Sequence, residues 1–247
     1  MNLTIGWLYP ELMSTYGDRG NIIFLKKRCE WRGINTEILN LNDGFDAMLL
    51  KKVDILFMGG AQDVQQKIVA KDLNARKVKS LKEKIQNNTP GLYICGAFQF
   101  LGKYYKDANG KAILGLSIFD LYTENPGLDS PRLIGNIVAK TEKHNIVLVG
   151  FENHGGRTYL GKTLRPFARV IKGFGNNGKD KTEGAIYKNS IGTYLHGPIL
   201  PKNPEIADWL IEKAIEKKYR KKIKLETLDD FISQKAREYI LEQLINL

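Results

Sequence analysis

The sequence predicts an α/β protein whose mostly parallel central sheet is flanked by helices and extended by antiparallel strands. The first half of the chain alternates β-type apolar runs with helical ones, which is typical of parallel strands joined by right-handed crossovers. The second half carries closely spaced β-type runs separated by Gly-, Asn- and Lys-rich turns, which favours antiparallel pairing. A chain of 247 residues can enclose one large core, so we expect a single domain over 1–247.

In the first half, the apolar runs predict strands at 3–9, 35–42, 53–60 and 92–94. Helices are predicted at 17–33, within 63–88 and from about 97. In the helix 17–33, the apolar residues recur at helical spacing and define a stripe that we expect to face the core, namely Ile22, Ile23, Leu25, Cys29 and Trp31. Gly33 is suited to end this helix.

In the second half, strands are predicted at 132–140, 145–154, 168–174, 184–188 and 191–197. Asn203 and Pro204 then open a helix, because asparagine caps a helix well and proline fits its first turn. A last helix is predicted at 228–245. We therefore expect a helical, basic C-terminal extension from about 217.

The composition is ordinary for a folded soluble protein, with 43% hydrophobic and 26% charged residues. No uncharged apolar run approaches the roughly 18 residues that a membrane span needs. The start MNLTIGWLYPELM lacks the pattern of a secretory signal. The chain has only two cysteines, so disulfides are not its means of stabilisation and a cytoplasmic location is expected.

The net charge of +11 is concentrated in KKYRKKIK at 217–224. The simpler interpretation is a solvated end of a helix, where cations suit the helix dipole. The alternative is contact with an anionic partner or with the cytoplasmic face of a membrane. We expect no nucleic-acid ligand.

Two glycine motifs match nucleotide-binding patterns but lack the required context. GRTYLGKT at 156–163 fits the phosphate-binding loop pattern, yet Pro166 and a β-type run follow it instead of a helix. GFGNNG at 173–178 is followed by KDKTEG, which favours a hairpin loop over a dinucleotide site.

The segment LYICGAFQFLG at 92–102 places Cys95 between a short apolar strand and a helix. A strand-turn-helix with small residues such as Gly96 and Ala97 is the arrangement of a nucleophile elbow. The N–H groups at the start of the helix would favour the thiolate. A buried, inert thiol is the competing interpretation.

His196 lies in IGTYLHGP, where a predicted strand meets a Gly-Pro turn, and it can reach the same sheet edge as Cys95. A cysteine and a histidine within hydrogen-bonding reach activate the thiol. The chain has three histidines. Of the others, His144 lies in a charged turn, and His154 in FENHGGR competes for the role of base.

CGAFQFLG and GTYLHG resemble the nucleophile and histidine motifs of class I glutamine amidotransferases of the cobyric acid synthase type. FENHGG at 151–156 and FMGGAQD at 57–63 resemble further segments of that family, the latter its oxyanion loop. The resemblance covers about 5–218. Within the family, NIIFLKKRCEWRG, FENHGGRTY and GTYLHGPILPKNPEI are most similar to the isoglutaminyl synthase group.

The resemblance implies that Cys95 attacks the side-chain amide of glutamine and that His196 keeps the thiol ionised and protonates the ammonia. The backbone N–H groups of Gly60 and Gly96 are the candidate oxyanion donors.

For the substrate, Arg132 is the candidate partner of the glutamine carboxylate, with Arg157 as the second choice. Gln99, one helical turn after the nucleophile, is expected to hydrogen-bond the substrate.

Many class I amidotransferases have a glutamate two residues after the histidine, but this chain has Pro198 there. The carboxylate that orients the histidine is thus expected from a partner subunit, or else from Glu152 or Glu205.

The resemblance further implies a heterodimer with a Mur ligase-like synthetase, which uses the ammonia to amidate D-glutamate of lipid II to D-isoglutamine in peptidoglycan synthesis. ATP and Mg²⁺ are expected on that partner, with no cofactor or metal in this chain. The alternatives are a cobyric acid synthase-like amidase for another acceptor, a non-catalytic scaffold, and a cysteine peptidase.

Overall fold

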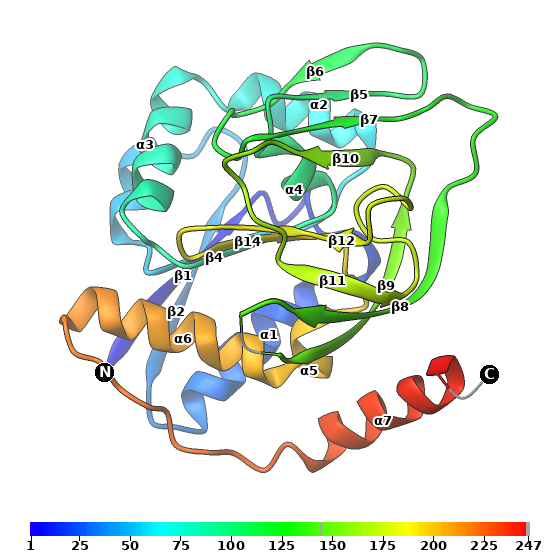
Figure 1. Cartoon of the computed structure of the whole chain (residues 1–247). Helices are drawn as coiled ribbons and strands as arrows, with labels where there is room; N and C mark the ends of the chain where they lie inside the picture. The colour runs from blue at the N-terminus through cyan, green and yellow to red at the C-terminus, as the bar shows by residue number, and fades with distance from the viewer. Residues whose placement is uncertain (144, 246–247) are drawn as a thin grey trace.

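A six-stranded sheet with the order β13-β14-β4-β3-β1-β2 forms the centre of the computed structural model, which describes residues 1–143 and 145–245 (Figure 1). Strands β1, β2, β3, β4 and β14 pair in parallel, and β13 joins β14 antiparallel. Their bounds are β1 (Asn2–Leu8), β2 (Asn35–Leu41), β3 (Ile55–Met58), β4 (Gly91–Ile94), β13 (Ala185–Tyr187) and β14 (Ser190–Thr193). The predicted α/β class with a mostly parallel sheet is confirmed.

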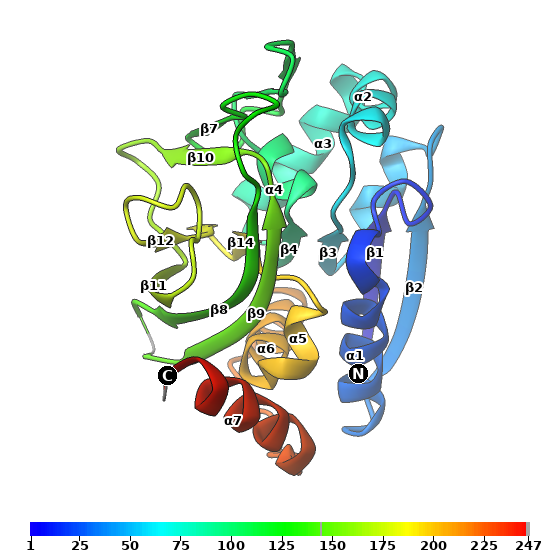
Figure 2. The same cartoon turned by 90° about the vertical axis from the view of Figure 1, so that its right-hand side faces the viewer.

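Helices lie on two sides of this sheet, which explains why β3, β4 and β14 are buried at every residue (Figure 2). One group is α1 (Arg19–Glu30), α5 (Ile199–Lys202) and α6 (Pro204–Tyr219), and the other is α2 (Asp63–Asp72), α3 (Ala75–Gln86) and α4 (Gly96–Phe100). The segment 63–88 forms two helices, because the Asn74 side chain accepts hydrogen bonds from the N–H groups of Arg76 and Lys77 and so starts α3. Two 3-10 turns, η1 (Thr15–Gly17) and η2 (Ala47–Lys52), complete this half.

Most antiparallel strands form two separate sheets, so the expectation that they extend the central sheet holds only for β13. One sheet has the order β10-β7-β5-β6 and the other β12-β11-β8-β9. Their bounds are β5 (Tyr104–Lys106), β6 (Ala112–Leu114), β7 (Leu121–Glu124), β8 (Leu133–Thr141), β9 (Val147–His154), β10 (Arg157–Leu160), β11 (Ala168–Lys172) and β12 (Thr182–Glu183). Because Lys103 N–H donates to the Leu121 carbonyl, the helix expected from 97 ends early and the chain turns toward β5.

The apolar stripe predicted on α1 is partly wrong. Leu25 and Cys29 are fully buried, but Ile23 is 50% and Trp31 59% exposed. The helix packs mainly against α5, α6 and β2, and the apolar residues on its outer side remain in solvent.

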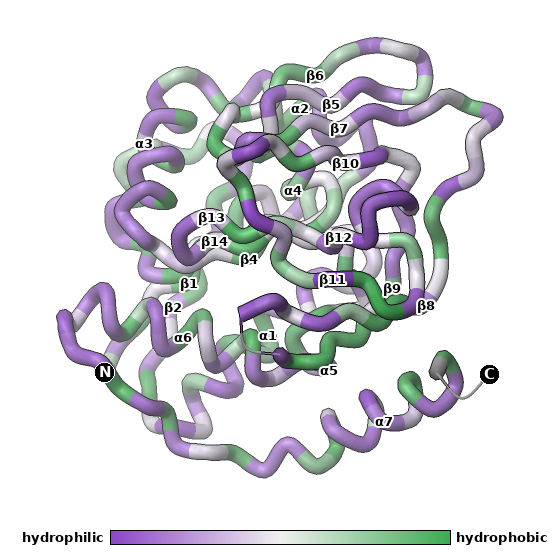
Figure 3. Tube along the Cα trace, in the orientation of Figure 1, coloured by the Kyte–Doolittle hydropathy of each residue, from purple (hydrophilic) through white to green (hydrophobic). Residues whose placement is uncertain are grey.

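The C-terminal segment begins where α6 ends at Tyr219, and its last helix is α7 (Phe231–Ile245), three residues shorter at its start than predicted. Figure 2 shows α7 beside α5 and the strands β8 and β9, and the hydrophilic colouring at the end of α6 in Figure 3 marks the basic stretch 217–224. Within the described residues, no helix is long and apolar enough to cross a membrane.

Arg28 attaches this segment to the rest of the fold. Its fully buried guanidinium donates to both carboxylate oxygens of Asp208 on α6 and of Asp230 just before α7, at 2.5 to 3.1 Å. A buried cation with two bidentate partners is costly to disrupt, because removing one side leaves the other uncompensated.

We expect Arg28→Met to lower the free energy of unfolding by about 3 kcal/mol, near the lower end of the range for a broken buried ion pair because both carboxylates keep some contact with water. Urea unfolding followed by circular dichroism measures this. Arg169→Met is the matched control, since Arg169 pairs with Glu142 at the surface and its loss should cost less than about 1 kcal/mol. Equal costs for the two variants would contradict the assignment.

Candidate active site

Cys95 lies at the junction of β4 and α4 in a strained backbone conformation, with φ 49° and ψ −104°. A non-glycine residue rarely adopts positive φ, and it does so here because both neighbouring elements fix the chain. On the β14 side, the Cys95 N–H donates to the Thr193 carbonyl at 2.8 Å. The geometry is that of a nucleophile elbow, and the 9% exposed side chain lines a cavity.

Gly96 is required by close packing at the start of α4. A Cβ there would lie 2.9 Å from Nε2 of Gln66 and 3.0 Å from the backbone nitrogen of Ala61. A larger residue would push the loop 59–62 away from the nucleophile. The Gly96 N–H belongs to the first turn of a helix and has no acceptor within that helix, so it is suited to bind an oxyanion.

His196 reaches the same edge of the sheet through the strand beside β4. β14 pairs with β4 in the register Thr193↔Ile94, and three residues later the backbone of His196 bonds with that of Phe151 in β9. A Cβ on Gly60 would lie 3.1 Å from Cε1 of His196 and 3.5 Å from Cβ of Cys95. The structure therefore brings the predicted pair together around Gly60.

Asp18, which the sequence analysis did not single out, orients the histidine. Its Oδ1 lies 3.3 Å from Nδ1 of His196, and both side chains are fully buried. This contact leaves Nε2, which has no other hydrogen-bond partner within the described chain, as the ring nitrogen available to the sulfur. Asp18 follows β1, whose carboxyl end lies at the same sheet edge as Cys95, so that topology was the signal that could have identified it.

The carboxylates proposed earlier for this role are used elsewhere. Glu152 accepts hydrogen bonds from the N–H groups of Phe174 and Gly175, and Glu205 pairs with Arg237 of α7. Neither contacts His196. Asp18 makes the contact with His196 that the sequence led us to expect from a partner subunit, or else from Glu152 or Glu205.

The structure also revises one oxyanion donor. The Gly60 N–H donates to Oδ2 of Asp18 at 2.6 Å and therefore does not face the thiol. The next N–H, that of Ala61, makes no hydrogen bond within residues 1–143 and 145–245 and lies close to Gly96. Ala61 and Gly96 are the better pair of candidate donors.

The protonation of His196 follows from its surroundings. Burial by itself lowers the pKa of His196, but the Cys95 thiolate and the Asp18 carboxylate more than offset this effect and raise the pKa to about 10. The histidine thus holds a proton over the physiological range, as the general acid of a cysteine–histidine pair requires.

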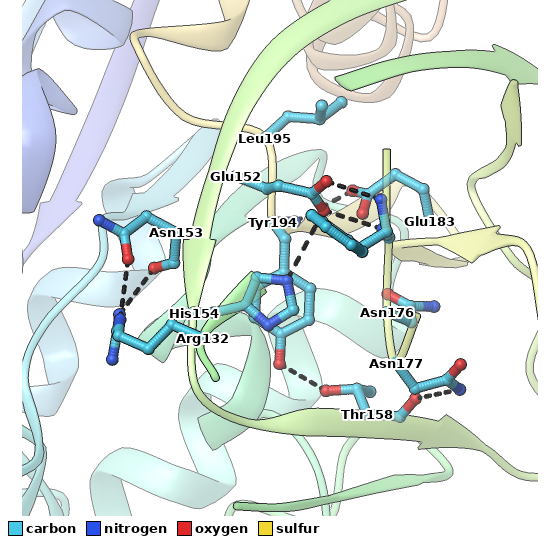
Figure 4. A network of polar contacts seen from close by, with 12 residues as sticks. Arg132, Glu152, Asn153, His154, Thr158, Asn176, Asn177, Glu183, Tyr194 and Leu195 are labelled. Atoms are coloured by element: carbon cyan, nitrogen blue, oxygen red, sulfur yellow. Dashed lines mark hydrogen bonds and ion pairs between the residues drawn. The ribbon is translucent and has the colours of Figure 1, made fainter. Parts of the chain in front are cut away.

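His154, the competing base, also lines the cavity but is held in a different arrangement. Its Nδ1 bonds to the Gly156 carbonyl at 2.8 Å, and its ring stacks on Tyr194 with the ring centroids 3.6 Å apart (Figure 4). Its Nε2 faces Glu152 at 3.8 Å, and burial lowers the pKa of His154. These contacts favour a structural role for His154 in its neutral form. His144, the third histidine, lies outside the described residues.

Arg132 lines the cavity, as predicted for the residue that binds the substrate carboxylate. It donates to the side-chain oxygen of Asn153 at 2.9 Å and to its carbonyl at 3.0 Å, which leaves Nη1 without a partner within the described ranges (Figure 4). Asn153 in turn donates to the hydroxyl of Tyr16, whose ring packs edge-on against His196. Asn153 thereby connects Arg132, the candidate binder of the substrate carboxylate, to Tyr16, which packs against the His196 ring.

The other two substrate candidates have internal partners. Arg157 donates to the carbonyls of Gly155 and Pro131 and does not line the cavity, so its role is to hold these loops. Gln99 does line the cavity, with its Nε2 donating to the Tyr194 hydroxyl at 3.1 Å.

The cavity beside Cys95 has a volume of about 370 Å³. Its walls come from η1, the loop 59–62, the start of α2, α4 and the segment 153–156, with Arg132 and His196 at its sides. Both nucleotide-binding motifs are excluded by their structure, since Arg157–Leu160 is a strand with no helix after it and GFGNNG forms the connection from β11 to β12.

Comparison with known proteins agrees with this geometry. The sequence profile of the CobB/CobQ-like glutamine amidotransferase domain matches residues 4–204. A glutamine-hydrolysing lipid II isoglutaminyl synthase subunit GatD from Streptococcus pneumoniae (strain ATCC BAA-255 / R6) is 44% identical over 96% of this chain and 90% of its own. The subunit of the same name from Staphylococcus aureus (strain N315) is 45% identical over 87% and 86%.

Among solved structures, a glutamine amidotransferase shares the fold with a TM-score of 0.56 at 12% identity, over 85% of this chain and 98% of its own. A glutamine amidotransferase from Thermotoga maritima has a TM-score of 0.54 at 13% identity, over 98% and 97%.

We expect NMR titration of histidine-labelled protein to give a pKa near 10 for His196 and, because His154 is buried, a pKa for His154 that lies below the ordinary value of histidine. Because the pKa of His196 is raised on folding, the stability it contributes is fully present below about pH 6.5 and is lost as the pH rises through about 10. In Asp18→Asn the pKa of His196 should fall, and with it the pH at which this stability is lost. An unchanged His196 titration in Asp18→Asn would contradict the role of Asp18.

Proposed function

Because the chain belongs to the CobB/CobQ-like glutamine amidotransferase family, we propose that it is the glutamine-hydrolysing subunit of a lipid II isoglutaminyl synthase. The observation that carries the proposal is the Cys95–His196 pair, with the buried Asp18 behind it, at the wall of one cavity. Arg132 on that cavity supplies the cation that a free amino acid substrate requires.

In the first half of the reaction, the Cys95 sulfur attacks the side-chain amide carbon of glutamine. The carbonyl oxygen becomes an oxyanion, which the N–H groups of Ala61 and Gly96 stabilise. His196 then donates its proton to the departing nitrogen, and ammonia leaves a glutamyl thioester on the sulfur.

In the second half, a water molecule attacks the thioester and gives a proton to Nε2 of His196. The carbon–sulfur bond breaks, glutamate leaves, and the thiolate and imidazolium are restored. Asp18 accepts a hydrogen bond from Nδ1 throughout, which fixes the ring and stabilises its charged form, as the buried aspartate does in serine hydrolases.

The ammonia must reach an acceptor before water dilutes it. We infer a Mur ligase-like synthetase subunit that activates the α-carboxylate of D-glutamate in lipid II, so that ammonia from this chain gives D-isoglutamine for peptidoglycan. ATP and Mg²⁺ would bind that subunit. Both proteins would act in the cytoplasm, where the lipid-linked acceptor is exposed.

The test is glutamate release from glutamine, measured for the chain alone and with a co-expressed partner. We expect no release for Cys95→Ala and a loss of about a hundredfold or more for His196→Ala, in the range of general acid–base catalysis. Cys29→Ala is the matched control, because Cys29 lies on the buried face of α1, does not line the cavity and should not affect the reaction. If His154→Ala lost activity and His196→Ala retained it, the role of the catalytic base would belong to His154 instead of His196.

The same preparation separates the alternatives. A glutamine-like electrophile such as diazo-oxo-norleucine should label Cys95 stoichiometrically, whereas a non-catalytic scaffold would leave it unlabelled. A peptidase would cleave peptides without selectivity for glutamine. A cobyric acid synthase-like amidase for another acceptor is less favoured, since the probable cobyric acid synthase of Methanothermobacter thermautotrophicus is 30% identical over 60% of this chain, against 44% over 96% for the subunit from Streptococcus pneumoniae.

The basic stretch 217–224 is a further part of the proposal, as a contact with an anionic membrane face. Lys217 and Lys218 are already engaged by Thr89 and Asp54. Lys221 and Lys222 are among the exposed cations of this stretch that remain for lipid. We expect Lys221→Glu/Lys222→Glu to weaken binding to phosphatidylglycerol vesicles by about tenfold or more, because each surface lysine contributes about 1 kcal/mol to such binding. The control is Lys71→Glu/Lys79→Glu, which reverses exposed charges elsewhere. Unchanged co-sedimentation of Lys221→Glu/Lys222→Glu would end this idea.

A further inference from the structure

The cavity beside Cys95 contains one carboxylate that the reaction above does not use. Asp63, the first residue of α2, is half-buried and lines the same cavity as Arg132. Within residues 1–143 and 145–245, no lysine, arginine or histidine nitrogen lies within 4.0 Å of this carboxylate, and its neighbour Lys67 pairs with Asp107 at 3.1 Å. Among the described residues, the Asp63 carboxylate in this cavity is therefore not paired with a basic side chain.

The carboxylate of Asp63 lies close enough to another residue of the cavity lining to affect it. Tyr105 lines the same cavity, and the pKa of its hydroxyl is raised first by burial and then by the negative charge of Asp63. Arg132 contributes the opposite charge, with Nη1 unpaired. Apart from the histidines, these two are the charged residues in the described lining.

A free amino acid carries two charges that must both be matched when water is excluded. The α-carboxylate of glutamine suits the planar guanidinium of Arg132. Its α-ammonium loses hydration in the cavity and needs an acceptor, for which a carboxylate is stronger than a neutral oxygen.

A purely structural role would also explain an aspartate at this position, since acidic residues in the first turn stabilise a helix. That role predicts a loss of stability that is independent of the substrate. It does not explain why the carboxylate lines the cavity together with an arginine.

We propose that Asp63 binds the α-ammonium of glutamine, so that the site selects free glutamine over glutamine whose amino group is acylated or absent. This inference rests on the proposed glutaminase function and adds the basis of substrate selectivity to it. Asp63 contacts the substrate but takes no part in bond breaking.

The experiment compares ammonia release from L-glutamine and from 4-carbamoylbutanoate, which is glutamine without its amino group, using the chain with its co-expressed partner. We expect Asp63→Asn to lower kcat/KM for L-glutamine by about tenfold or more, mostly through KM, because a hydrogen bond to a charged group is lost. The value for 4-carbamoylbutanoate should stay within about twofold. The preference of the wild type for L-glutamine should therefore largely disappear.

Glu11→Gln is the matched control. Glu11 lines a neighbouring cavity that shares Thr15 and Gln62 with the first, and its carboxylate accepts a hydrogen bond from Asn42. The variant removes the same charge near the same opening and should leave the preference intact. Urea unfolding of all variants checks that each is folded.

Equal losses of Asp63→Asn on both substrates, or no loss on either, would overturn the inference. If the wild type released no ammonia from glutamine, the proposed function would fail instead. In that case calorimetry still tests the role of Asp63, by measuring the binding of L-glutamine and 4-carbamoylbutanoate to Cys95→Ala and to Cys95→Ala/Asp63→Asn. A selective loss of L-glutamine binding in the double variant supports the role of Asp63, and equal binding to both variants refutes it.

Discussion

The parallel pairing of β4 with β14 is the constraint on which the candidate active site depends. The hydrogen bond from the Cys95 N–H to the Thr193 carbonyl continues this ladder past the last paired residues and fixes where the nucleophile leaves the sheet. The chain reaches His196 three residues after the end of β14. The strained backbone at Cys95 is therefore held in place by the hydrogen bonds between two fully buried strands. The spacing of these neighbouring strands also sets the distance between the Cys95 sulfur and the His196 imidazole.

A buried polar layer behind β14 keeps that strand in place. Glu183 accepts hydrogen bonds from the Thr193 hydroxyl and the Tyr194 N–H, and burial raises the pKa of Glu183 to about 7. Tyr194 stacks on His154 and bonds through its hydroxyl to Thr158 at 2.6 Å (Figure 4). Because these hydrogen bonds and the stacked rings lie away from water, the backbone leading to His196 has little freedom to move.

The face of the cavity opposite this layer is built from loops. Tyr16, in η1, has a left-handed backbone and remains 47% exposed while its ring covers His196. Through Asn153 it is connected to Arg132. The strands of the central sheet thus position Cys95 and His196, whereas Tyr16 and Arg132, on the other side of the cavity, belong to connecting segments.

Patterns along the chain predicted the parts of the site that carry their own local signal. Cys95 was predicted because a short apolar strand, small residues and a helix are adjacent in sequence, and His196 because it ends a β-type run. Asp18 was missed and Gly60 was assigned the wrong hydrogen bond, since neither contact leaves a mark near the residue itself. The same is true of the separate antiparallel sheets, because periodicity identifies strands but not their partners.

The sequence alone thus predicted the α/β class, which the structure confirms, and the candidate nucleophile, imidazole and cation, which the structure places at one cavity, because strand-turn-helix signals and residue chemistry act over a few neighbouring positions. Only the tertiary structure decided which carboxylate meets the imidazole, which N–H groups remain unbonded, and that Asp63 and Arg132 line one cavity. These outcomes depend on which strand ends lie side by side, and strand order is fixed by long-range packing and hydrogen bonding.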